Sequence, residues 1–174
     1  AELPVPGKFN PQDSSGNPVR AGSGNQVAGV QRNLGFEALA VSPDGKVVFV
    51  ANEAALLQDD SRAPFDSESN QAQGSDSRIL RFVQDPEGNW QAGAEKVYRA
   101  DRGINLILLR LFNTVVSVLT IDDRGRMLVM ERGVAGTGLN TGSFRVRIYE
   151  IDFSQEDATD VAPYPSLLDL PAPL

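Results

Sequence analysis

The pattern of apolar and polar positions changes near Phe36, where apolar runs of strand length begin. Phe36–Val41 and Val47–Ala51 are two such runs, and a Ser-Pro-Asp-Gly-Lys segment joins them. Apolar runs that flank Pro, Asp and Gly are typical of a β-hairpin. Every position of the second run is apolar, so we expect a strand that is covered on both faces.

A second hairpin is predicted farther along the chain, after a polar stretch from Gln58 to Ser77 that indicates a long loop. Arg78–Val83 and Trp90–Arg99 flank an Asp-Pro-Glu-Gly-Asn turn. The last strand begins with apolar residues at every second position, namely Trp90, Ala92 and Ala94. This alternation indicates a more exposed strand at the edge of a sheet.

The same order of strand, turn and strand then returns. Val115–Ile121 and Met127–Met130 flank an Asp-Asp-Arg-Gly turn, and Arg145–Phe153 follows a glycine-rich loop. Aligning the two turns on their glycines gives an offset of 80 residues, which pairs Leu39 with Leu119 and Val48 with Leu128. We interpret this pattern as an internal repeat.

A recurring four-stranded unit with apolar inner strands is typical of a β-propeller blade. The predicted fold class is therefore all-β, with antiparallel four-stranded blades. Propellers close with about four to eight blades, and this chain holds about two, so we expect an incomplete propeller whose other blades lie outside these residues. Residues 1–32 are interpreted as a loop, a linker or a remnant of a preceding blade. Residues 33–174 form the propeller fragment, with repeats at about 33–102 and 103–161.

The repeat also predicts the core. Strands central to each repeat carry eight apolar candidates: Phe36, Leu39, Val48, Val50, Leu80, Leu119, Leu128 and Ile148. Residues 1–32 are rich in Pro, Gly and polar residues, so we expect little of the core to come from them. Leu106–Val116 interrupts the second repeat with extra apolar residues, and we expect an irregular excursion or a short helix there.

Composition and charge narrow the chemistry. The 174 residues include neither His nor Cys, which excludes Ser-His-Asp and Cys-His nucleophilic sites, histidine phosphatases and zinc sites built from these ligands. The net charge of −7 disfavours nucleic acid and anionic membranes as partners. The apolar segment Ile104–Ile121 contains Arg110, so we do not expect it to span a membrane. The glycine-rich loop lacks Gly-Lys-Ser/Thr, so no nucleotide is expected.

Several motifs resemble those of a known family. In chain order they are Asn33, Gly35-Phe36-Glu37, Leu39-Ala40, Ser42-Pro43-Asp44-Gly45, Glu53, Gln58-Asp59-Asp60, Arg78-Ile79-Leu80-Arg81, Asp122-Asp123, Gly125-Arg126, Leu128-Val129, Glu131-Arg132, Arg147 to Asp152, and Thr159-Asp160-Val161. Over about 33–161 they resemble the bacterial phytase-like family described as "esterase-like activity of phytase". The resemblance implies a propeller fold, export from the cytoplasm and a hydrolase.

Carboxylates and arginines supply the candidate chemistry. Strand carboxylates are rarely buried unless they are paired or metal-bound, and a guanidinium binds two phosphate oxygens in one plane. We assign Glu37, Glu131 and Arg132 as candidate catalytic residues, Arg78 and Arg147 as candidate substrate-binding residues, and Glu53, Asp59 and Asp60 as candidate ligands of Ca²⁺. The alternatives are structural ion pairs with Arg32, Arg78 or Arg132, and a solvated acidic loop at Asp59 and Asp60.

These observations predict an exported hydrolase that acts on a small-molecule phosphate or other ester, in the periplasm or outside the cell. The chain begins without a basic and apolar leader, so we expect that a signal peptide was removed or that the chain is a fragment. The alternative is a noncatalytic propeller that binds a ligand or a protein through its loops, because fold does not fix function. The sequence makes no prediction of oligomeric state.

Overall fold

The computed structural model describes residues 2–59, 76–100, 110–120, 122, 125–136, 143–154 and 159–171, with the backbone alone at 110–120, 133–136 and 143–145. Regular structure in these residues is antiparallel β, together with two short 3₁₀ helices, η1 (Gly7–Phe9) and η2 (Leu167–Asp169). The predicted all-β fold class is confirmed. Within the same residues no helix is long and apolar enough to cross a membrane.

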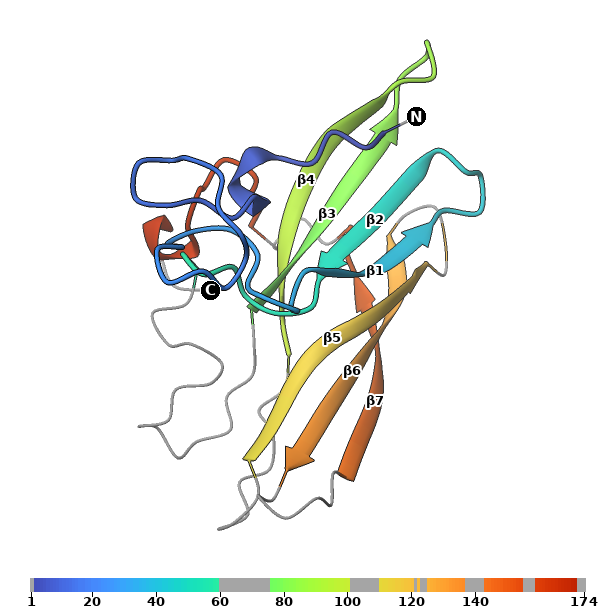
Figure 1. Ribbon diagram of the computed structural model, residues 1–174. Helices are drawn as coiled ribbons and strands as arrows, with labels where there is room; N and C mark the ends of the chain where they lie inside the picture. The colour runs from blue at the N-terminus through green and yellow to red at the C-terminus, as the bar shows by residue number, and fades with distance from the viewer. Residues whose placement is uncertain are drawn as a thin grey trace.

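The strands form two sheets (Figure 1). The first has the order β1-β2-β3-β4 and contains β1 (Phe36–Val41), β2 (Val47–Asn52), β3 (Asp76–Gln84) and β4 (Trp90–Arg99). The second has the order β5-β6-β7 and contains β5 (Arg110–Thr120), β6 (Arg126–Gly136) and β7 (Ser143–Asp152). β1 lies beside β5, so the sheets meet along their first strands. The described residues show these two sheets and do not show a closed propeller ring.

The hairpin turns lie where the sequence predicts them. Gly45 donates its N–H to the Ser42 carbonyl at 2.9 Å, and Gly88 donates its N–H to the Asp85 carbonyl at 2.9 Å. These glycines have φ angles of 74° and 85°, and Gly125 in the third turn has 106°. Positive φ is strained for residues with a side chain but not for glycine. The glycines therefore allow the chain to reverse at these points.

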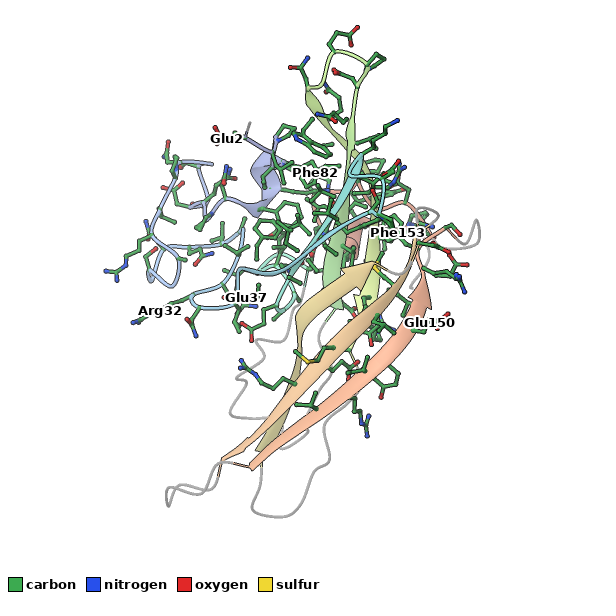
Figure 2. All side chains as sticks on the ribbon, turned by 90° about the vertical axis from the view of Figure 1, so that its right-hand side faces the viewer. Glu2, Arg32, Glu37, Phe82, Glu150 and Phe153 are labelled. Atoms are coloured by element: carbon green, nitrogen blue, oxygen red, sulfur yellow. The ribbon has the colours of Figure 1, made fainter. Side chains whose placement is uncertain are left out.

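Two apolar layers cover the two faces of the first sheet. Between the sheets, Phe49 and Phe153 pack edge to face with their ring centroids 5.1 Å apart. On the opposite face, Phe9 packs in a cluster that includes Phe82 (Figure 2 labels Phe82 and Phe153). Phe9 is only 2% exposed, so the expectation that residues 1–32 add little to the core is wrong. A single aromatic anchor in a segment rich in turns leaves no periodic signal in the sequence.

The strand pairing repeats with an offset of 79 residues, not 80. Leu39 pairs with Val50 in the first sheet, and the corresponding pair in the second sheet is Val118 with Val129. The bulge in the first hairpin, at Phe36/Ala38, returns at Val115/Ser117. Alignment on Gly45 and Gly125 gives 80 because the glycine with positive φ occupies different positions in the two turns.

The offset of 79 shows which residues of the two sheets are equivalent, and therefore which faces of the two sheets pack against each other. Successive side chains of a strand point to opposite faces, so a shift of one residue exchanges the faces. Phe49 of the first sheet faces the second sheet, and its counterpart Leu128 lies on the far face of the second sheet. The two sheets are therefore stacked front to back, which is the sense in which neighbouring blades of a propeller are stacked.

The predicted core residues are confirmed in part. Val48, Val50 and Leu80 are buried, Phe36 and Leu128 are half-buried, and the side chain of Leu119 lies outside the described residues. The predictions that Leu39 and Ile148 are buried are wrong, because these side chains are 62% and 61% exposed. The residues that cover Val48 and Val50 leave Leu39 exposed, and within the described residues no element packs on the face of β7 that carries Ile148.

The segment Leu106–Val116 is partly within β5. Residues 110–116 form the first part of that strand, so the expectation of an irregular excursion or a short helix is wrong for them. Residues 106–109 lie outside the described residues. The strand is longer than predicted because β6 continues to Gly136, whose partner is Arg110. β2 and β4 agree with their predictions, since β2 is buried at every position and β4 lies at a sheet edge.

Candidate functional site

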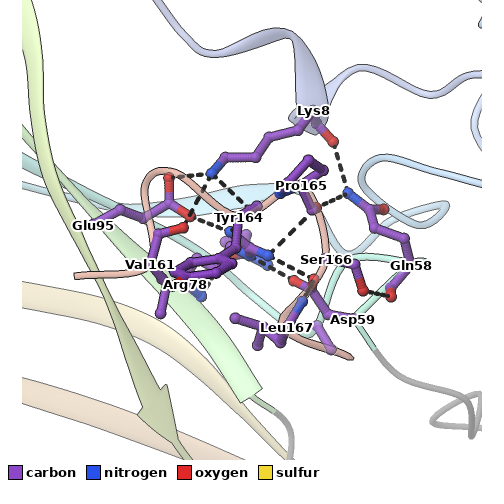
Figure 3. Close-up of polar contacts among 12 residues, drawn as sticks. Lys8, Gln58, Asp59, Arg78, Glu95, Val161, Tyr164, Pro165, Ser166 and Leu167 are labelled. Atoms are coloured by element: carbon purple, nitrogen blue, oxygen red, sulfur yellow. Dashed lines mark hydrogen bonds and ion pairs between the residues drawn. The ribbon is translucent and has the colours of Figure 1, made fainter. Parts of the chain in front are cut away.

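A buried ion cluster joins the loop after β2 to β3 and β4 (Figure 3). Arg78 donates from Nε and Nη2 to the two carboxylate oxygens of Asp59, each at 2.6 Å, and its Nη1 lies 2.5 Å from Glu95 Oε1. Lys8 Nζ lies 3.1 Å from Glu95 Oε2. Two cations thus face two carboxylates, which is the balance that buried charges require.

The C-terminal segment 159–171, which we call the strap, closes this ion cluster. The Tyr164 carbonyl accepts hydrogen bonds from Lys8 Nζ and from Arg78 Nη1, each at 3.2 Å. The backbone N–H of Leu167 donates to Asp59 Oδ1 at 2.9 Å. The strap therefore binds the ion cluster through its backbone, which fastens the two ends of the described chain to the first sheet.

Arg78 and Asp59 are engaged within the chain. Burial opposes the charge of Arg78, but hydrogen bonds to Asp59 and Glu95 hold its pKa above the usual value. The side chains of Arg78 and Asp59 are both 0% exposed. The structure thus places one predicted substrate-binding residue and one predicted metal ligand in a buried ion cluster, where each is bound to the other.

A second polar group lies between the sheets. Glu131 on β6 is 1% exposed, and Tyr98 on β4 donates its hydroxyl to Glu131 Oε1 at 2.7 Å. Arg147 on β7 is the cross-strand partner of Glu131, and its Nη1 donates to the hydroxyl of Tyr149 at 3.0 Å. Cross-strand partners share a face of the sheet, so Glu131 and Arg147 both lie on the face that is turned to the first sheet.

An ion pair beside Glu131 completes this group. Arg132 Nη2 lies 3.3 Å from Glu53 Oε1, and the side chains are 45% and 8% exposed, respectively. For Glu53 the structure shows the structural ion pair that the sequence offered as the alternative to metal binding. We call Glu53, Tyr98, Glu131, Arg132 and Arg147 the β6 cluster. Four of its members are predicted site residues: Glu131 and Arg147 share the face turned to the first sheet, whereas Arg132, the next residue of β6, is 45% exposed and pairs with Glu53.

The remaining predicted site residues are Glu37 and Asp60, and the described residues do not bring them together with the others around a cation. Glu37 is exposed at the bulge of β1, and Asp60 lies outside the described residues. Across the described ranges no three carboxylates gather in the way that a metal ion requires. Asp59 binds Arg78 and Glu53 binds Arg132, so the described donors do not fit a Ca²⁺ site, which needs several oxygens around one point.

The repeat gives Glu131 and Arg147 counterparts in the first sheet. The offset of 79 relates Glu131 to Asn52, and the pairing of β3 and β7 with their neighbours relates Arg147 to Arg78. In the first sheet Asn52 Oδ1 accepts the backbone N–H of Arg78 at 2.7 Å. The second sheet therefore carries a carboxylate at a buried position where the first sheet carries a neutral amide.

Tyr98, Glu95 and Lys8 are not among the site residues that the sequence predicts. Apolar alternation starting at Trp90 puts Tyr98 on the same face as Trp90, but the two side chains pack in different apolar layers. The cause is a β-bulge in the pairing of β3 and β4. Gly93 is the signal that was available, because a glycine inside a strand often marks a bulge.

Two stacked antiparallel sheets related by a repeat, with a charged group between them, define an all-β protein built from repeated hairpin sheets. A family model described as "Phytase-like: Esterase-like activity of phytase" matches residues 1–171. The chain belongs to the phytase-like family, as its motifs indicated, and the match also includes the first 32 residues. No curated protein and no solved structure matches the chain.

Proposed function

We propose that this chain is an exported phytase-like hydrolase that acts on phosphate or other esters of small molecules, in the periplasm or outside the cell. Membership of the phytase-like family supports the class of activity. The β6 cluster supports the chemistry, because ester hydrolysis needs a carboxylate that accepts a proton and cations that bind the anionic oxygen of the transition state.

The buried carboxyl group of Glu131 carries the proposal. Burying a carboxylate costs free energy unless it is hydrogen-bonded or paired, and the amide of Asn52 serves at the equivalent buried position of the first sheet. The second sheet keeps a carboxylate at the strand position where the first sheet has a neutral amide, and this difference is the reason that we favour a functional role for Glu131.

The chemistry assigned to the β6 cluster is general-base hydrolysis. Glu131 would accept a proton from water, whose oxygen forms a bond to the phosphorus or carbonyl carbon of the ester. Arg147, which lies on the same face of the sheet as Glu131, would bind the oxygens on which negative charge develops. The ester bond then breaks, and the leaving alkoxide takes the proton from Glu131, which returns to its carboxylate form.

Turnover by the purified chain tests the proposal. We expect hydrolysis of at least one of p-nitrophenyl phosphate, p-nitrophenyl acetate and phytate, and a loss of about 10²- to 10⁴-fold in kcat for Glu131→Gln. Glu150→Gln is the matched control, because Glu150 is 59% exposed on β7 and points away from the first sheet. Absence of turnover of all three compounds by the unaltered chain would reject the hydrolase and favour a ligand-binding propeller.

Calcium stays a prediction of the sequence, and thermal unfolding tests it. If carboxylates outside the described residues complete a site, CaCl₂ raises the melting temperature, because a ligand that binds only the native state stabilises it. The triple variant Glu37→Gln, Glu53→Gln, Glu131→Gln should then lose that rise. A melting temperature that is the same with CaCl₂ and with a chelator would remove calcium from the proposal for this chain.

A further inference from the structure

The β6 cluster takes one of its members from the first sheet. Tyr98 lies on β4, the edge strand of that sheet, whereas Glu131 lies on β6, the central strand of the second sheet. Resting on the hydrolase proposed above, we propose that Tyr98 is a positioning residue: its hydroxyl fixes the Glu131 carboxylate in the orientation that proton transfer needs.

The bulge between β3 and β4 directs Tyr98 to this place. Leu80 pairs with Glu95 and Phe82 with Ala92, so β4 contains one extra residue between these pairs. An extra residue turns the following side chains to the other face of the strand. Tyr98 therefore packs against the layer between the sheets, while Trp90, before the bulge, packs on the opposite face.

The hydrogen bond supplies an orientation that the glutamate side chain lacks by itself. The terminal torsion of Glu has a broad distribution of angles. The donor at 2.7 Å fixes the position of Oε1, and Tyr98 is itself held by packing between the sheets. One oxygen of the catalytic carboxylate is thus held by a residue of the other sheet, so we expect sheet packing and turnover to be coupled.

A double-mutant cycle in the full chain tests this role. Tyr98→Phe removes only the hydroxyl, so we expect kcat to fall about 10- to 100-fold because a misplaced reacting group costs that much, with KM changed less than about twofold. If Tyr98 acts through Glu131, Tyr98→Phe should have no further effect on kcat in a Glu131→Gln background. Tyr164→Phe is the control, because the contacts described for Tyr164 on the strap are made by its backbone.

The outcomes separate the positioning role from the proposed function. A Tyr98→Phe variant with wild-type kcat, or a cycle in which the two effects multiply, overturns the role of Tyr98 while the hydrolase stands. A parallel loss of kcat and folded fraction, measured by thermal unfolding of the same samples, shows a merely structural tyrosine and also overturns it. If the unaltered chain hydrolyses none of the three esters, the hydrolase and the positioning role fail together.

Discussion

Arg78 and Arg147 occupy equivalent strand positions but have different surroundings. Arg78 is fully buried among two carboxylates and the backbone of the strap, whereas Arg147 is half-buried in the β6 cluster. The repeat explains why an arginine stands at both positions, and the neighbouring segments decide what each arginine does. A substitution of the first should therefore act on stability, and a substitution of the second on ligand binding.

Arg78→Met leaves Asp59 and Glu95 with one cation fewer in a buried place. We expect a loss of about 3 to 5 kcal/mol in the free energy of unfolding, as is typical when one partner of a buried ion pair is removed. Urea denaturation measures it. Arg99→Met is the control, because Arg99 is 59% exposed in its pair with Asp76, and such pairs contribute less than about 1 kcal/mol. Equal losses in the two variants would show that the ion cluster is not a stabilising centre.

Ile79 and Ile148 form a second matched pair of equivalent residues. Ile79 is 1% exposed between the sheets, and Ile148 is 61% exposed on the far face of β7. Ile79→Ala should cost about 2 to 5 kcal/mol, while Ile148→Ala should change the free energy of unfolding by less than about 0.5 kcal/mol. The comparison uses chemical denaturation of both variants. A large cost at Ile148 would mean that its face is covered in solution.

Among the secondary-structure elements, the hairpin turns are the ones that the sequence predicts best. In the first turn the Ser42 hydroxyl donates to Asp44 Oδ1 at 2.6 Å, and the backbone N–H of Lys46 donates to the same oxygen at 3.0 Å. The second and third turns are closed in a similar way by Asp85 and Asp122. Each turn therefore contains an aspartate whose charged form accepts hydrogen bonds from the turn itself.

The first turn gives a pH-dependent prediction. The Ser42 hydroxyl and the Lys46 backbone N–H lower the pKa of Asp44 below 3.8. Because the folded-state pKa is lowered, the stabilisation is present above the unfolded-state pKa and is lost as the pH falls through the folded-state value. Asp44→Ala should thus melt at a lower temperature than the wild type at pH 7, and the two melting temperatures should converge as the pH falls through the lowered pKa of Asp44. A difference that is constant with pH would contradict this origin.

Turn chemistry explains which elements could be predicted from the sequence and which could not. Pro, Asp and Gly set the positions of the hairpins, so the strands beside Gly45, Gly88 and Gly125 were found. The register between repeats was missed by one residue, since a glycine with positive φ marks a turn but not its position within the turn. The face of Tyr98 was missed because a β-bulge is decided by pairing between strands, which a single strand's pattern does not record.

The sequence predicts which residues belong to the candidate sites, but it does not predict which of them lie together in the structure. Charged residues in or beside strands predict Glu131, Arg132, Arg147 and Glu53, and the structure pairs Arg132 with Glu53 and places Arg147 opposite Glu131. Arg78 is predicted as an arginine that binds an anion and Asp59 as an acidic residue that opens the long loop, and both lie in the ion cluster. Charge alone could not separate the two groups, because the separation depends on the strap and on Lys8, which are distant in the sequence.

At the scale of the whole molecule, the N-terminal segment and the strap cover the face of the first sheet that is turned away from the second (Figure 1). Lys8 connects them, since its ammonium binds the carbonyls of Ala162 and Tyr164 as well as Glu95. Lys8, whose side chain is 12% exposed, is thus one of the residues that join the two terminal segments.

Lys8→Ala should weaken the attachment of the strap. We expect a loss of about 1 to 3 kcal/mol in the free energy of unfolding, because buried acceptors and the Glu95 carboxylate lose their donor. Limited proteolysis followed by mass spectrometry should show faster cleavage within the strap than in the wild type. Lys46→Ala is the control, because Lys46 lies in an exposed hairpin turn. Unchanged cleavage of the strap would show that its other contacts suffice.

The closing contacts of the strap also set an order of folding events. Lys8 binds the Tyr164 carbonyl 156 positions farther along the chain, and Arg78 binds the same carbonyl over 86 positions. Closing such long loops is slow because the entropy of the intervening chain is lost before the contact forms. During synthesis, the contacts of Lys8 and Arg78 with the Tyr164 carbonyl can form only after the strap has left the ribosome. The hairpins, whose contacts are local, can form before the strap closes the ion cluster.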